Sequence, residues 1–173
     1  MKMRTRFLAA LAVAFAIGAM AGCATPAPTP TDTGNPQLPN PWIDATAAQA
    51  AEVLGGTMYS FTTLDSAYKQ YALLVTTDDA VQKTGVKPTA WVRFQKGDED
   101  VSLQIFKGGK LDAEQLKGTP ADLKGAMAYI SQNEDGTSNI AWEANGLLYE
   151  ISTSIPWSSG DLIALAQGVK AAS

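Results

Sequence analysis

Two glutamates near the C-terminal end are the residues whose type and spacing come nearest to catalytic chemistry. Glu143 and Glu150 lie in neighbouring alternating segments and could face one another across a hairpin. Paired carboxylates serve as acid and base in glycoside cleavage. Both glutamates alternate with aromatic residues, Trp142 and Tyr149, so the pattern places the carboxylates on the solvent side of a sheet and the rings in the core. We therefore expect no catalytic residue, and a cell-envelope hydrolase that uses paired carboxylates is the alternative function.

Two acidic stretches have ligands of the kind that Ca²⁺ prefers. One is Asp98-Glu99-Asp100, and the other is the segment 133–139, NEDGTSN. Ca²⁺ needs several carboxylate or carbonyl oxygens. The first stretch is typical of a charged hairpin tip, and the second has an Asp-Gly turn but no glutamate at the spacing of a calcium loop. We expect neither a metal site nor a cofactor.

The chain has no histidine and one cysteine. Without histidine there is no Ser-His-Asp or Cys-His arrangement for nucleophilic catalysis, and the commonest zinc and copper ligand is missing. These absences favour a binding protein over an enzyme.

Aromatic residues offer the remaining candidate site. The segment 89–95 alternates so that Val92 and Phe94 take the core side, which leaves Trp91 and Arg93 on the other. An exposed tryptophan on an open sheet face indicates an interaction surface, so Trp91 with Arg93 is the predicted one. An aromatic groove is the wider hypothesis, and its members are Trp91, Trp142, Tyr149 and Trp157.

The start of the chain has the organisation of an export signal. Basic residues at 2, 4 and 6 precede an uncharged run from Phe7 to Met20, which is too short to span a bilayer. The run ends in Met20-Ala21-Gly22-Cys23, which resembles a bacterial lipobox. That resemblance implies cleavage between Gly22 and Cys23 and a diacylglycerol on the Cys23 sulfur, with palmitate-type acyl chains that anchor the protein to the outside of the cell membrane. The alternative is an ordinary secretory signal cut near Ala21, which leaves Cys23 incidental.

The segment 23–40 follows as a tether rich in proline and threonine. Its composition cannot bury enough apolar surface to order it, and at about 3 Å per residue it could lift a domain roughly 50 Å from the membrane. Without residues 1–22 the chain has 10 basic and 17 acidic residues, a net charge of −7. This balance excludes a nucleic-acid binder, which needs a basic patch.

Residues 41–173 have the length of one domain and contain no cysteine. Thr46 with Gln49 predicts a capped helix that ends at Gly55. Strands are expected at 56–61, 66–77, 89–95 and 100–107, short helical turns at 111–125, a three-stranded meander at 126–154, and a closing helix from Ser158. The fold class is therefore α+β: a single antiparallel sheet of about six strands, with an N-terminal and a C-terminal helix on one face.

Two ends of this domain resemble a known one. The segments 40–56 (NPWIDATAAQAAEVLGG) and 142–154 (WEANGLLYEISTS), the latter followed by DLIALAQGV, are similar to an uncharacterised extracytoplasmic domain of Gram-positive lipoproteins and anti-sigma-factor-like proteins. The resemblance covers about residues 40–172 and implies a sensing, binding or accessory role at the cell surface. It carries no catalytic residues.

The sequence therefore predicts a non-catalytic lipoprotein, held to the membrane through Cys23, that binds an envelope protein or a small ligand. An inhibitor or accessory subunit of a membrane complex is a further alternative.

Overall fold

The computed structural model describes residues 40–112, 114 and 117–172. The predicted signal peptide, the lipid site at Cys23 and all of the tether except its last residue lie outside the described residues. No helix among those described is long and apolar enough to cross a membrane.

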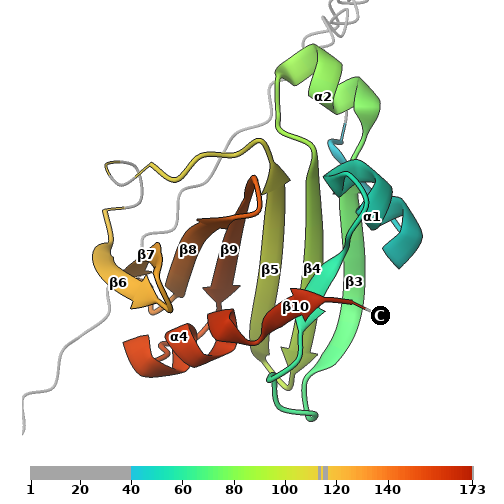
Figure 1. Ribbon diagram of the computed structural model, residues 1–173. Helices are drawn as coiled ribbons and strands as arrows, with labels where there is room; N and C mark the ends of the chain where they lie inside the picture. Colours follow the sequence, from blue (N-terminus) through green and yellow to red (C-terminus); the bar gives the residue numbers. More distant parts are fainter. Residues whose placement is uncertain (1–39, 113, 115–116, 173) are drawn as a thin grey trace, which may run out of the picture. The chain divides into compact units, whose positions relative to one another are not determined.

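The described residues form an α+β fold built on one antiparallel sheet (Figure 1). Its eight strands lie in the order β1-β3-β4-β5-β9-β8-β7-β6. The strands are β1 (Trp42–Asp44), β3 (Lys69–Thr76), β4 (Thr89–Lys96), β5 (Glu99–Lys107), β6 (Thr119–Leu123), β7 (Ala126–Gln132), β8 (Ser138–Ala144) and β9 (Leu147–Thr153). A separate ribbon pairs β2 (Tyr59–Phe61) with β10 (Val169–Ala171).

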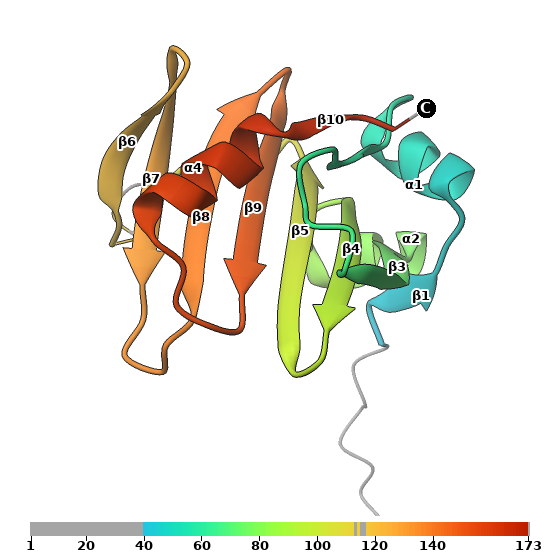
Figure 2. The ribbon, with the colours of Figure 1, turned by 90° about the horizontal axis from the view of Figure 1, so that it is seen from below.

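Within the described residues, three helices accompany the sheet: α1 (Ala47–Leu54), α2 (Asp78–Thr84) and α4 (Ser159–Gln167). Helix α1 packs on β3, β4 and β5, and α4 packs near β8 and β6. Figure 2 shows α4 and β10 lying across one face of the sheet. We call this covered side the inner face and the opposite side the outer face. Helix α2 joins β3 to β4 at the end of the sheet (Figure 1).

Strand alternation builds the core on the inner face. Directly paired residues across neighbouring strands point to the same side, and the register aligns Val92 with Leu103, Leu103 with Ile151, and Ile151 with Ile140. All four side chains are buried, as are Leu162 and Leu165 of α4 and Ala50 and Leu54 of α1. The core thus forms between the inner face and the elements that cover it.

The local signals at helix ends act as the sequence predicts. Thr46 and Gln49 form a capping box at α1, and Gly55 ends the helix with a left-handed backbone. Ser158 caps α4 by accepting a hydrogen bond from the Asp161 amide. Asn145 and Gly146 both have positive φ, at 54° and 74°, and form the tight β8–β9 turn.

Three fold predictions are wrong. The main sheet has eight strands rather than about six, because β1 and β6 were not expected. The segment 119–123 is strand β6 and not a helical turn, since its residues pair with β7 from Thr119↔Ile130 to Leu123↔Ala126. The expected strand at 56–61 lies outside the main sheet as β2 and pairs with β10.

Candidate functional site

Five side chains gather on the outer face at the β1 end of the sheet, and we call them the outer-face cluster: Trp42, Tyr71, Trp91, Arg93 and Asp100. The ring centroids of Trp42 and Trp91 are 5.4 Å apart. The Arg93 guanidinium carbon lies 4.8 Å from the Trp91 ring centre and 5.0 Å from that of Tyr71. The arginine thus lies over two aromatic rings, an arrangement with a cation–π attraction of about 0.5–2 kcal/mol per ring.

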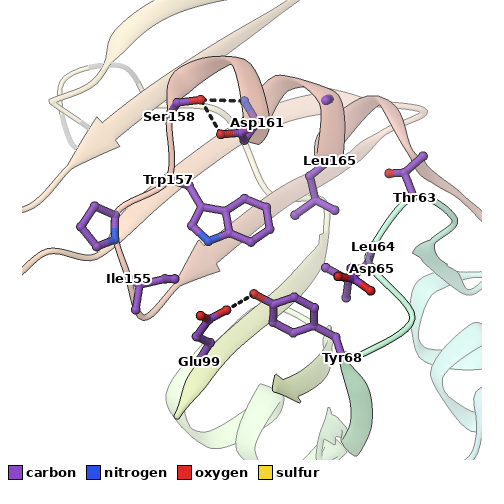
Figure 3. Close-up of a pocket in the computed structure, with 12 residues that line it drawn as sticks. Thr63, Leu64, Asp65, Tyr68, Glu99, Ile155, Trp157, Ser158, Asp161 and Leu165 are labelled. Carbon is purple, nitrogen blue, oxygen red and sulfur yellow. Dashed lines mark hydrogen bonds between the residues drawn. The ribbon is translucent and has the colours of Figure 1, made fainter. Parts of the chain in front are cut away.

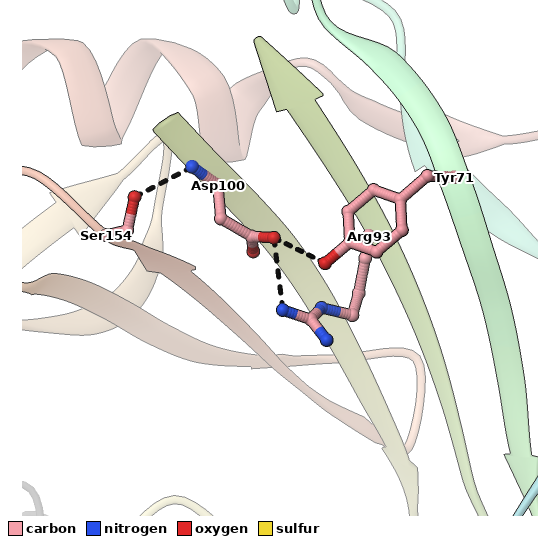
Figure 4. Close-up of polar contacts among 4 residues, drawn as sticks. All are labelled: Tyr71, Arg93, Asp100 and Ser154. Atoms are coloured by element: carbon pink, nitrogen blue, oxygen red, sulfur yellow. Dashed lines mark hydrogen bonds and ion pairs between the residues drawn. The ribbon is translucent and has the colours of Figure 1, made fainter. Parts of the chain in front are cut away.

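Asp100 fixes the polar ends of this cluster (Figure 4). Its Oδ2 accepts from the Arg93 Nη2 at 3.1 Å and from the Tyr71 hydroxyl at 2.5 Å. The Asp100 amide donates to the Ser154 Oγ at 2.7 Å. The Arg93 and Asp100 side chains are 33% and 27% exposed, so solvent screens the ion pair only in part.

The sequence places these residues through two backbone features. Strand alternation turns Trp91 and Arg93 outward while Val92 turns inward. In β3 the register shifts between Gln70 and Ala72, a bulge that aims the Tyr71 side chain at Arg93. Burial, and then the hydrogen bond to Asp100, raises the pKa of Tyr71 to about 12, so its hydroxyl keeps its proton and donates.

Two hydrogen-bond donors of the outer-face cluster are left unsatisfied. Among the described residues, Trp91 Nε1 and Arg93 Nε are buried donors that have no hydrogen-bond partner. An unsatisfied buried donor costs about 1–3 kcal/mol. Trp91 is half-buried rather than fully open because Trp42 lies beside it.

The two glutamates with catalytic spacing do share the outer face, but not as directly opposed residues. Glu143 pairs with Leu148, and Glu150 pairs with Ala141, so the two are offset diagonally. Glu143 accepts from the Leu111 amide and lies 3.6 Å from Lys110 Nζ, while burial raises the pKa of Glu150. Glu143 therefore holds the segment after β5 against the sheet.

The acidic side chains of the stretch Asp98-Glu99-Asp100 do not converge on one site. Glu99 and Asp100 are successive residues of β5 and point to opposite faces: Glu99 accepts from the Tyr68 hydroxyl, and Asp100 joins the outer-face cluster. In the segment 133–139, Asp135 accepts from Thr137 within the turn. No group of three potential metal ligands occurs in the described part of the chain.

The aromatic groove hypothesis is wrong, because the structure separates its four members. Trp142 and Tyr149 are 4% and 2% exposed and stack in the core with centroids 5.0 Å apart. Trp91 lies on the outer face. Trp157 lines a cavity on the other side of the sheet.

This cavity, which we call the α4 pocket, has a volume of about 480 Å³. It lies between the start of α4, the loop before β3 and the beginning of β5 (Figure 3). Its lining residues are Thr63, Leu64, Asp65, Tyr68, Glu99, Ile155, Pro156, Trp157, Ser158, Asp161, Ala164 and Leu165. Burial, and then the hydrogen bond to Glu99, raises the pKa of Tyr68 to about 12.

The pocket offers binding groups rather than an activated nucleophile. Its only serine, Ser158, donates to Asp161 Oδ2 at 2.6 Å and accepts from the Asp161 amide at 3.1 Å, which is the geometry of a helix cap. Sequence reasoning singled out neither Tyr68 nor Glu99 for this site. No local sequence pattern predicts the contact between Tyr68 and Glu99, because 31 positions separate them in the sequence.

Comparison with protein families and with curated proteins finds no match. Among solved structures, the chain is similar to one chain in the complex structure of Pseudomonas aeruginosa MucA/MucB, with 11% sequence identity and a TM-score of 0.43. The similarity covers 66% of this chain and 35% of that chain, so the chain spans only about a third of its length. A likeness this distant carries no argument about function.

Proposed function

We propose that this protein is a lipid-anchored, non-catalytic binding protein on the outside of the cell membrane, and that the outer-face cluster docks a partner protein. The observation that carries the proposal is the set of side chains at the cluster. Tryptophan, tyrosine and arginine dominate the hot spots of protein interfaces, and here all three lie together on the sheet face opposite the one that packs into the core.

The unpaired donors favour a partner with acceptor oxygens. Trp91 Nε1 and Arg93 Nε belong to side chains that contact Trp42 and Tyr71, and Tyr71 is 47% exposed. A small shift of those rings upon docking opens the donors to backbone or side-chain carbonyls of a partner, which relieves an internal cost of about 1–3 kcal/mol for each donor. Neither donor has a hydrogen-bond acceptor among the described residues of the isolated chain.

The position of the cluster also suits a partner near the membrane. Trp42 belongs to β1, the first strand after the tether. A lipid on Cys23 with an extended tether keeps this strand within roughly 50 Å of the bilayer surface. The partner we propose is therefore an envelope protein whose extracytoplasmic part reaches that height.

Site-directed photocrosslinking in intact cells tests the proposal. A photoreactive residue in place of Gln95, exposed on the outer side of β4, should crosslink one partner, whereas the same residue in place of Glu52 on α1 should not. Adding Trp91→Ala should weaken the crosslink from position 95. Met127→Ala is the matched control, because Met127 is 57% exposed and lies far along the same face on β7.

The proposal fails if the crosslink from position 95 is unchanged by Trp91→Ala, or is equally strong from position 52. The anchor is tested separately by mass spectrometry of the mature N-terminus. Diacylglycerol on Cys23 is the expected result, and a free thiol there removes the membrane-anchored part of the proposal.

A further inference from the structure

The α4 pocket is a second site, independent of the outer-face cluster, and its lining is chemically one-sided. Three of its residues are carboxylates, Asp65, Glu99 and Asp161, and none is a lysine or arginine. Its volume of about 480 Å³ falls within the range of small-molecule sites, about 300–1,000 Å³. The question is what kind of molecule this lining favours.

The carboxylates are held in place by neutral donors. Asp65 Oδ1 accepts from the Ala67 amide at 2.9 Å, Glu99 Oε2 from the Tyr68 hydroxyl at 2.5 Å, and Asp161 Oδ2 from the Ser158 hydroxyl at 2.6 Å. Within the described residues, the ion pairs involve other acids, namely Asp79, Asp100 and Glu143. None of the three pocket carboxylates forms an ion pair within the described residues, although Lys96 is the direct cross-strand partner of Glu99.

The positive charge near the pocket is smaller than the negative charge of its three carboxylates. The N-terminus of α4 contributes the equivalent of about half a positive charge, and Asp161 lies in its first turn. Lys96 lies over the Tyr68 ring, with its Nζ 5.4 Å from the centroid, and Lys69 donates to the Ser66 carbonyl outside the lining. Three carboxylates of the lining thus stand against the partial charge of the helix and, beside Glu99, the single charge of Lys96. This negative balance disfavours an anionic ligand.

Two aromatic rings form the apolar part of the wall. Tyr68 and Trp157 have centroids 6.4 Å apart at an interplanar angle of 64°. The contact with Lys96 shows that the Tyr68 ring already attracts an ammonium group on one side. Figure 3 shows Trp157 between Asp161 on one side and the Glu99–Tyr68 pair on the other. Acidic groups are therefore separated by an aromatic surface, which suits a ligand with separated ammonium groups and an apolar chain between them.

We propose that the α4 pocket binds an aliphatic polyamine. Its ammonium groups pair with Glu99, Asp161 and Asp65, and its methylene chain packs on Trp157 and Tyr68. The carboxylates attract the ammonium groups of the polyamine. The two rings add cation–π and apolar contacts to its chain, and a bare metal cation has no methylene groups to make those apolar contacts.

Isothermal titration of the purified full chain with spermidine at low salt tests this proposal. Glu99→Gln keeps an acceptor for the Tyr68 hydroxyl while removing the charge, and should weaken binding about 2-fold to 5-fold. Trp157→Leu should weaken it to a similar degree. Asp79→Asn removes a carboxylate from α2, where it pairs with Lys83 at 2.8 Å, and should leave binding unchanged. The neutral chain 1,8-octanediol should not bind.

Three results overturn the proposal: no spermidine binding at millimolar concentration, equal losses in Glu99→Gln and Asp79→Asn, or full affinity in a folded Trp157→Leu protein. If Trp157→Leu does not fold, the comparison of Glu99→Gln with Asp79→Asn decides alone. Trp91→Ala should leave spermidine binding intact, so failure at this pocket is distinguishable from failure of the outer-face proposal.

Discussion

Gly168 links α4 to β10, and its substitution by alanine is the most informative test of how the inner-face cover is held. A Cβ atom at this position would lie 1.9 Å from Thr63 Oγ1, 2.7 Å from Thr63 Cγ2 and 2.8 Å from Thr63 Cβ. The Gly168 φ of −84° suits any residue, so the cost arises from the clash and not from the backbone.

The size of the destabilisation depends on which atoms of Thr63 can move away from the added methyl group. Rotation about χ1 relocates Oγ1 and Cγ2 of Thr63 but not its Cβ, so the backbone must shift as well. Thr62 binds the Gly168 carbonyl twice, through its amide at 2.9 Å and its hydroxyl at 2.7 Å, and resists that shift. Overpacking destabilises the folded state by about 1–3 kcal/mol. Alanine also lowers the conformational entropy of the unfolded chain relative to glycine, which stabilises the folded state by about 0.4–1 kcal/mol. Gly168→Ala should therefore destabilise the protein by about 1–2 kcal/mol.

Urea unfolding monitored by tryptophan fluorescence measures the effect as a shift in midpoint at constant slope. Thr63→Ala leaves the 2.8 Å contact to Cβ and should rescue Gly168→Ala only in part, while Thr63→Gly removes all three of these contacts and should restore most of the loss. The reasoning is refuted if Gly168→Ala is as stable as the parent, or if Thr63→Gly gives no coupling energy in the double-mutant cycle.

Three further predictions concern a turn, a buried phenol and the anchor. Asn145→Ala should cost about 1 kcal/mol in urea unfolding because φ is 54° there, whereas Asn145→Gly should be nearly neutral. The pKa of Tyr68 is raised to about 12 from 10.0, so its contribution is complete below pH 10 and is lost as the pH rises towards 12; the stability difference between parent and Tyr68→Phe should shrink by up to about 2 kcal/mol over that window. A difference that stays constant with pH contradicts this assignment. Cys23→Ser should move the protein from the membrane fraction to the medium, and unchanged fractionation would contradict anchoring through Cys23.

Elements with a local signal could be predicted from the sequence. The capping box of α1, the Asn145-Gly146 turn and the alternation of β4 each depend on residues a few positions apart. Helix α2 has such a signal too, with Thr77 as its cap and Gly85 at its end, but its seven residues are too few and too polar to show an apolar helical stripe. The Thr119-Pro120 pair predicts a helix start, yet pairing with β7 holds these residues in a strand. Tertiary pairing overrides a local preference at such an edge.

Long-range pairing accounts for the rest. Strand β1 is three residues long, and only its register with β3 makes it part of the sheet. The same pairing brings Trp42 to Trp91 and completes the outer-face cluster. The α4 pocket likewise draws Tyr68, Glu99 and Trp157 from distant segments. Sequence alternation predicts which face Trp91 and Arg93 take, but not which side chains meet them there.

Oxidative footprinting in membranes tests the central claim, docking of a partner on the outer-face cluster, most directly. Tyr71 is 47% exposed in the isolated chain and Met127 is 57% exposed, so both should oxidise in the purified protein. In native membranes the account predicts strong protection of Tyr71 and Trp91 with Met127 still reactive. Equal oxidation of Tyr71 in membranes and in the purified chain would contradict it.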